Sequence, residues 1–203
     1  MASMQRPPKG LAALFTPLLL AAAALFFTAV PATAAPAPWT LTGDVVRVVD
    51  GDTVTLLDAE RQEHRIRLAS IDAPEKRQPW GQAARQALAE QSWRRNATAQ
   101  CRKRDRYGRE VCTLEVDGMD LGLALIRAGL AWHYLDYLRE QTREEARAYA
   151  EAQVAAREAG RGLWADAEPT PPWAWRRQSH SRTAPERGNA DDARLHPTAA
   201  PSH

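Results

Sequence analysis

The segment VVDGDTVTLL, residues 48–57, places an Asp-Gly pair between two runs of β-branched and other apolar residues. An Asp-Gly pair in this setting is a strong signal for a β-hairpin, because glycine readily adopts the positive φ that a two-residue turn requires. Residues 41–57 are therefore predicted to form two antiparallel strands joined at Asp50-Gly51-Asp52. Asp and Gly are ordinary turn residues, so these ten residues alone favour a bare turn over a functional loop.

The following segments extend this pattern into a small domain. Residues 63–71, EHRIRLASI, alternate apolar side chains with arginines and predict a third strand, and residues 97–116 predict a second hairpin. Helices are predicted at 81–95, 120–128 and 139–159, the last two closed by glycines. A meander of strands with later helices favours an α+β, mainly β fold, in which about three α-helices pack on a closed barrel of the oligonucleotide-binding (OB) type.

The N-terminal segment 1–34 is predicted to be a secretory signal peptide. Arg6 and Lys9 precede an apolar run at 11–30, and the small residues 32–34 suit a signal peptidase. An uncleaved membrane anchor is the alternative, because the run is near the length that spans a bilayer. Removal of Arg6 and Lys9 leaves a formally neutral chain, so that any basic surface has to come from local clustering.

Two flanking segments carry no periodic pattern. Residues 35–41 are predicted to be a linker that precedes a domain at 42–166. Residues 167–203 are rich in Pro, Ala, Ser and Arg and are predicted to be a mostly disordered tail. Trp173 and Trp175 within it either dock on the domain or remain exposed.

The two cysteines, Cys101 and Cys112, lie in the part of the chain that is predicted to be exported. An oxidising compartment lets thiols pair, so a disulfide across the second hairpin is the favoured interpretation. Two free buried thiols are the alternative.

Five polar residues are left unexplained by the strand pattern. Asp52 begins one strand and Asp72 follows the end of another, so the meander can bring both carboxylates to one edge of the sheet. Two close carboxylates repel one another unless a cation lies between them, and hard oxygen ligands suit Ca²⁺ or Mg²⁺. Glu75 adds a carboxylate suited to act on water, and Arg67 and Arg109 offer the bidentate donors that a phosphodiester needs.

Together these features resemble the staphylococcal nuclease (thermonuclease) family. The segments VVDGDTV, RIRLASIDAPE, DRYGR, DLGLALIRAGLAW and GLW follow in the order of the family and span about residues 44–164. The resemblance implies a five-stranded barrel with helices and a Ca²⁺-dependent phosphodiesterase that acts on DNA and RNA and leaves 3′-phosphate ends.

The resemblance also implies roles for individual residues. Asp52, Asp72 and the backbone carbonyl of Ala73 match the calcium ligands, although Ala73 stands where the family often has Thr. Glu75 matches the residue that orients or deprotonates the attacking water, and Asp50 matches an acidic neighbour of the calcium ligands. Arg67 and Arg109 match the phosphate-binding arginines.

The substrate side of the site matches less completely. Arg106 and Tyr107 match residues that contact a terminal phosphate, and Tyr137 matches a nucleotide-side tyrosine. Leu135 stands at a neighbouring aromatic position of the family, which weakens the expected base-stacking surface. The predicted signal peptide places the chain in the periplasm or the medium, with no stable membrane association after signal cleavage, and a monomer is the default state. A catalytically silent module that binds nucleic acid or protein is the alternative.

Overall fold

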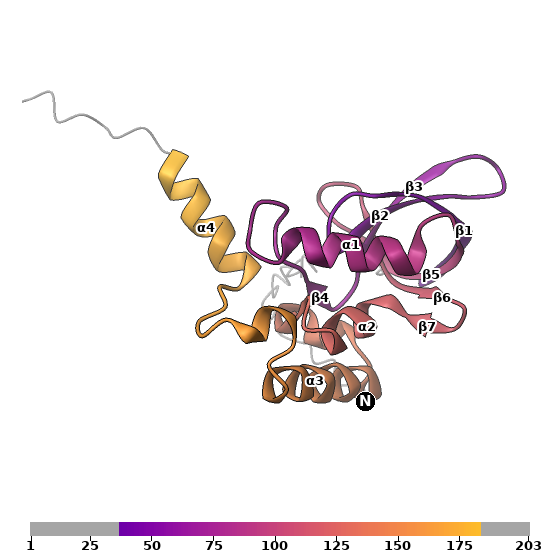
Figure 1. The fold of residues 1–203 in the computed structure, drawn as a ribbon. Coiled ribbons are helices and arrows are strands. Elements are labelled where there is room, and N and C mark those ends of the chain that lie inside the picture. Colours follow the sequence, from indigo (N-terminus) through magenta and orange to yellow (C-terminus); the bar gives the residue numbers. More distant parts are fainter. Residues whose placement is uncertain (1–36, 184–203) are drawn as a thin grey trace, which may run out of the picture. The chain divides into compact units, whose positions relative to one another are not determined.

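Five strands close into a barrel in the computed structural model, which describes residues 37–183 (Figure 1). The strands are β1 (Trp39–Val48), β2 (Thr53–Leu57), β3 (Glu63–Leu68), β5 (Asn96–Arg104) and β6 (Glu110–Val116). Antiparallel pairing joins β3 to β2, β2 to β1, β1 to β5 and β5 to β6, and parallel pairing of β3 with β6 closes the ring. The predicted mainly β, five-stranded OB-type barrel is confirmed.

Two short additions flank the barrel. β7 (Met119–Asp120) pairs with β6, and β4 (Ile71–Asp72) pairs with β8 (Trp132–His133) in a separate two-stranded sheet. In that sheet Asp72 lies opposite Trp132. The pairing fixes the backbone of Asp72 just beyond the end of β3.

Three α-helices pack on the strands as predicted: α1 (Gly81–Ser92), α2 (Leu121–Arg127) and α3 (Arg143–Glu158). α2 contacts both β6 and α3, and α1 contacts β1 and α2 (Figure 1). α1 ends before the predicted residue 95, because Trp93 leaves the helical conformation with ψ 125°, and Arg94 follows in a left-handed conformation with φ 57°. Two 3₁₀ helices, η1 (Leu135–Glu140) and η2 (Gly162–Ala165), connect the later elements.

The third helix begins later than predicted, at Arg143 instead of Arg139. Thr142 caps it, because its side chain accepts a hydrogen bond from the Glu145 amide at 3.1 Å and the Glu145 carboxylate accepts one from the Thr142 amide at 2.8 Å. This capping box satisfies two amides that have no partner inside the helix. Residues 139–140 belong to η1 instead.

The core lies inside the barrel and between the barrel and the helices. Val45, Val54, Ile66, Leu114 and Leu125 are fully buried there. Burial of each such side chain stabilises the fold by about 1.5–3 kcal/mol. Cys101 and Cys112 face one another across β5 and β6, with their Cα atoms 4.0 Å apart, and form the predicted disulfide.

The turn between β1 and β2 differs from the prediction. It spans four residues, 49–52, and the φ of Gly51 lies outside the left-handed region. A Cβ on Gly51 would lie 2.7 Å from the Ala84 Cβ and 2.8 Å from the Ala73 Cβ. Gly51 is therefore required because its backbone lies too close to α1 and to the segment after β4 for a side chain to fit. A positive φ is not the reason.

The predicted disorder of the tail is wrong for part of it. Residues Pro172–Thr183 form the helix α4. Pro172 occupies its first position, where a backbone N–H would have no partner inside the helix, so its absence costs no hydrogen bond. The Trp173 ring packs 5.6 Å from the Trp132 ring and 5.6 Å from the Tyr134 ring, measured between centroids. These tertiary contacts order a segment whose sequence lacks a helical period.

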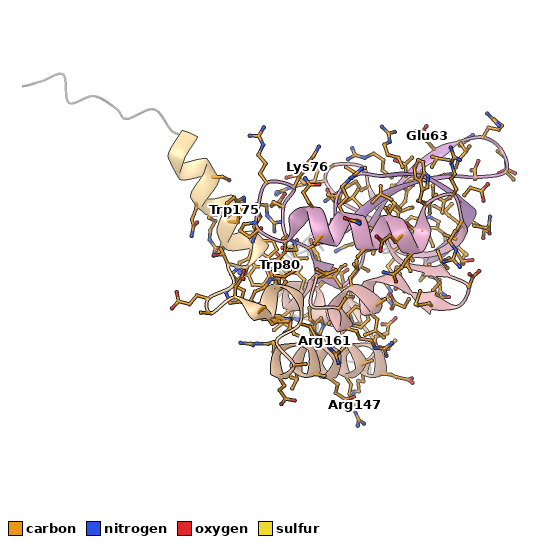
Figure 2. All side chains as sticks on the ribbon, in the orientation of Figure 1. Glu63, Lys76, Trp80, Arg147, Arg161 and Trp175 are labelled. Atoms are coloured by element: carbon orange, nitrogen blue, oxygen red, sulfur yellow. A yellow bond between two sulfur atoms is a disulfide. The ribbon has the colours of Figure 1, made fainter. Side chains whose placement is uncertain are left out.

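Trp175 and Trp80 line one small pocket at the junction of α4 with the loop that precedes α1 (Figure 2).

The predicted segments before and after the domain differ from the observed ones. β1 begins at Trp39, inside the predicted linker 35–41, because its first residues pair with β5, where Trp39 lies opposite Cys101. The predicted signal peptide 1–34 and the end of the tail, 184–203, lie outside the described residues. Between residues 37 and 183, no helix has the length and apolar character needed to cross a membrane.

Candidate active site

One open cleft of about 1100 Å³ lies at the edge of the barrel where the β1–β2 turn, the segment after β4 and the β5–β6 turn meet. Residues of β3, β4, β5, β6, η1 and α4 and Tyr134 complete its lining. Nine of the residues singled out from the sequence line this cleft, namely Asp50, Asp52, Arg67, Asp72, Glu75, Arg106, Tyr107, Arg109 and Tyr137. Ala73 adjoins it through its backbone, since its amide donates to Asp52 Oδ2 at 3.0 Å.

Asp52 and Asp72 converge on one guanidinium. Arg67 Nη2 lies 3.1 Å from Asp52 Oδ2 and 3.0 Å from Asp72 Oδ1, and Arg67 Nη1 donates to the Leu68 carbonyl at 2.9 Å. Asp72 is 1% exposed and Asp52 is 7% exposed. Twenty residues apart in sequence, the two carboxylates therefore share one cation inside a largely buried site.

The β1–β2 turn fixes Asp52 from several directions. Its amide donates to Asp50 Oδ1 at 3.1 Å, its carbonyl accepts from the Leu68 amide at 2.8 Å, and its Oδ1 accepts from the Thr53 hydroxyl at 3.0 Å. Burial, together with the nearby charge of Asp52, raises the pKa of Asp50 to about 6. Asp50 thus orders the turn and places a further acid beside the two carboxylates.

Burial is also the largest influence on Asp72. It raises the pKa of the Asp72 carboxyl above its usual value, although hydrogen bonds from Arg176 and the charge of Arg67 oppose the shift. A buried carboxylate beside another one is stabilised by additional positive charge. Arg67 and Arg176 supply that positive charge in the structure.

The donors present suit a hard divalent cation. Asp52 and Asp72 supply carboxylate oxygens, and the segment after β4 brings the Ala73 backbone against Asp52. Over residues 37–183, no three His, Cys, Asp or Glu side chains form a ready metal-binding group. A cation here would rely on two carboxylates, backbone oxygen and water, which fits Ca²⁺ better than a metal that needs nitrogen or sulfur ligands.

Glu75 stands at the mouth of the cleft, with its side chain 40% exposed. Its amide donates to Gln78 Oε1 at 3.0 Å, and its Oε1 accepts from Arg176 Nη1 at 2.7 Å. Gln78 is 6% exposed and anchors the loop that carries Glu75. A half-exposed carboxylate on an anchored loop can accept a proton from water at this edge.

Arg109 reaches the cleft from the β5–β6 turn, where Asp105 positions it. Asp105 Oδ1 accepts from the amides of Tyr107 and Arg109, both at 2.9 Å, and Asp105 Oδ2 accepts from Arg109 Nε at 2.7 Å. Arg109 Nη1 lies 3.4 Å from the Thr53 hydroxyl. Sequence reasoning missed the role of Asp105, for which the Asp at the start of the DRYGR turn was the available signal.

Aromatic side chains surround the outer part of the cleft. Tyr107 is 64% exposed, and its hydroxyl accepts from Arg106 Nη2 at 2.7 Å. The ring of Tyr137 lies 3.8 Å beneath Lys103 Nζ. Leu135 is 61% exposed and does not line the cleft, so Tyr134 and Tyr137 supply the aromatic surface on this side.

Basic side chains cluster locally in the cleft. Basic side chains outnumber acidic ones in its lining, which includes Arg65, Lys103, Arg104 and Arg177 besides the arginines already described. A concave surface with excess positive charge attracts polyanions. Arg176, Arg177 and Trp173 of α4 were not predicted as part of this site.

Comparison with known proteins gives a consistent set of relatives. A family profile described as "Staphylococcal nuclease homologue" matches residues 65–166. The chain is 41% identical over 176 residues to Protein ParB of Escherichia coli, across 81% of this chain and 94% of that protein. It is 36% identical over 173 residues to the micrococcal nuclease of Shigella flexneri, with 81% and 94% of the two chains covered. An "Uncharacterized endonuclease" of Escherichia coli O157:H7 is 41% identical over 135 residues, which cover 66% of this chain and 84% of that protein.

Proposed function

Since this chain belongs to the staphylococcal nuclease family, we propose that it is an exported, Ca²⁺-dependent nuclease that hydrolyses phosphodiester bonds of DNA and RNA. The observation that carries the proposal is the convergence of Asp52 and Asp72 on Arg67 in a cleft that Glu75 and Arg109 also line. The protein acts as a monomer, and its products end in 3′-phosphate.

The carboxylates of Asp52 and Asp72 and the backbone carbonyl of Ala73 would hold the cation. When bound there, Ca²⁺ supplies Lewis-acid stabilisation of the negative charge that builds on the phosphate. Asp50 supports the site indirectly, because it accepts the hydrogen bond of the Asp52 amide and so holds the turn in place.

The two arginines bind the phosphodiester. Arg67 and Arg109 lie on the barrel and on the β5–β6 turn, and each presents a planar guanidinium to the cleft. Such forks bind phosphate oxygens with two donors, and they gain strength as charge develops on those oxygens. Asp105 holds the Nε side of Arg109 and so fixes the plane of its fork.

Glu75 orients the attacking water and accepts its proton. The water oxygen forms a bond to phosphorus, the bond from phosphorus to the 5′ oxygen breaks, and the departing 5′ oxygen takes a proton from solvent water, which leaves a 3′-phosphate and a 5′-hydroxyl. Arg106 and Tyr107 contact the terminal phosphate of the nucleotide, and Tyr137 and Tyr134, which line the cleft, offer an aromatic surface to the base.

Digestion of single-stranded DNA in Ca²⁺ and then in excess chelator tests the proposal. We expect cleavage in Ca²⁺ that stops when the chelator is added. Cleavage that survives chelation would refute the role of the cation. Oligonucleotide binding without cleavage in either condition would favour a silent binding module instead.

A further inference from the structure

The guanidinium of Arg176 on α4 sits directly on the carboxylates assigned to the cation site. Its Nη2 donates to Asp72 Oδ2 at 2.8 Å, and its Nη1 donates to Asp72 Oδ1 at 3.2 Å and to Glu75 Oε1 at 2.7 Å. Asp72 is almost fully buried, whereas the Arg176 side chain is 40% exposed. An arginine from the C-terminal helix therefore reaches into the site and engages two acids at once.

From these contacts we propose that Arg176 is a built-in competitor for the divalent cation. In the cation-free protein, α4 holds the guanidinium on Asp72 and Glu75, and cation binding expels it from the cleft. The inference rests on the proposed function, since it takes Asp72 to be a cation ligand.

Competition follows from the oxygens that are already in use. Asp72 Oδ1 accepts from Arg67 Nη2 and from Arg176 Nη1, and Asp72 Oδ2 accepts from Arg176 Nη2. A cation that binds Asp72 must take one of these oxygens, and it repels a guanidinium that remains on the same carboxylate. The low solvent exposure of Asp72 increases this repulsion, because little water is present to screen it.

The contacts of Arg176 place it on the acids of the site. Both of its terminal nitrogens donate to carboxylates, and Nη1 donates to two. Arg109, whose Nε alone is held by a carboxylate, is the more suitable phosphate ligand.

The first turn of α4 is attached to the domain, whereas Arg177 and Gln178 beyond Arg176 are exposed. Trp173 packs on Trp132 and Tyr134, and Gln78 Nε2 donates to the Thr170 carbonyl at 2.6 Å. Gln78 also holds the loop of Glu75 through its Oε1. The contacts of Trp173 and Thr170 thus keep the Arg176 guanidinium near the site at high effective concentration. The guanidinium can leave the carboxylates without any opening of the barrel.

Two neighbouring arginines allow a matched comparison. Arg177 also lines the cleft and lies on the same helix, but the side chain that contacts Asp72 and Glu75 is that of Arg176. Arg176→Gln and Arg177→Gln remove the same charge. Only the first removes the competing hydrogen bonds, and Arg176→Lys keeps the charge but cannot bridge both carboxylates.

Calorimetric titration of CaCl₂ into the full-length, chelator-treated protein measures the competition without a catalytic readout. We expect the Kd for Ca²⁺ to fall about tenfold in Arg176→Gln, to fall less in Arg176→Lys, and to stay within about twofold of wild type in Arg177→Gln. Asp72→Asn should abolish the binding heat.

Equal Kd values for Ca²⁺ in wild type and Arg176→Gln would refute the proposal that Arg176 competes with the cation, and would leave the proposed cation site itself intact. An unchanged Kd for Ca²⁺ with weaker binding of a single-stranded oligonucleotide in chelator would overturn it as well, and would make Arg176 a phosphate ligand. The lack of any Ca²⁺ binding heat in wild type and in Arg176→Gln would overturn the proposed cation site itself and the competitor with it.

Discussion

Replacement of Arg67 by lysine isolates the contribution of its planar fork. The guanidinium donates to Asp72 Oδ1 and the Leu68 carbonyl and lies 3.1 Å from Asp52 Oδ2. A lysine ammonium keeps the charge but not this geometry, so we expect it to lose the bond to the carbonyl and one contact to a carboxylate. These are worth about 0.5–1.5 and about 1.5–3 kcal/mol, and because the side chain is only 14% exposed, solvent screens them little.

The lost positioning energy is thus about 2–4.5 kcal/mol. If the transition state depends on the position of this guanidinium, Arg67→Lys lowers kcat by about 30- to 1,600-fold, since each 1.4 kcal/mol corresponds to a factor of ten. Turnover of a defined single-stranded oligonucleotide at saturating Ca²⁺ gives kcat and KM separately. Arg47→Lys is the control, because Arg47 pairs with Glu63 on the exposed surface. A kcat of Arg67→Lys within about fivefold of wild type would refute the reasoning.

Three further changes test other parts of the structure. Asp105→Asn weakens the acceptor that holds Arg109, so we expect kcat in the same oligonucleotide assay to fall about tenfold with little change in KM; an unchanged kcat would contradict this positioning role. Replacement of both Cys101 and Cys112 by Ala opens a loop of 11 residues and should lower the free energy of urea unfolding by about 3 kcal/mol, whereas a loss below about 1 kcal/mol would count against the disulfide as a major stabiliser. Hydrogen bonding to Asp58 raises the pKa of His64 above 6.5, so protonated His64 stabilises the fold most below that pH. The difference in unfolding free energy between wild type and His64→Gln should therefore shrink as the pH rises through the raised pKa, and a pH-independent difference would exclude this ion pair.

The sequence predicted the parts of the fold that depend on local pattern and on ordered motifs. The alternation around Ile66 and the Asp-Gly signal are local properties, and they were sufficient to predict β2 and β3. Asp52 and Asp72 could be placed at one edge because both lie at strand ends, and the structure brings them to one guanidinium.

Other features depend on contacts that no local pattern reports. Gly51 was expected to provide a positive φ. Glycine is instead needed at this position because the side chains of Ala73 and Ala84, which only folding brings near it, leave no room for a Cβ. The helix α4 was missed because its residues lack a helical period, and Trp173 orders it through the rings of Trp132 on β8 and of Tyr134, which directly precedes η1. Arg176 therefore had no sequence signal that linked it to Asp72.

The central claim is that water attacks phosphorus in this cleft with the help of Glu75. Cleavage of a defined oligonucleotide in ¹⁸O-enriched water, followed by mass spectrometry of the product ends, tests it most directly. We expect one ¹⁸O atom on the 3′-phosphate of the products, an unlabelled 5′-hydroxyl, and a strongly reduced rate of the same labelling in Glu75→Gln. Label on a 5′-phosphate, or a Glu75→Gln variant that labels at the wild-type rate, would contradict the account.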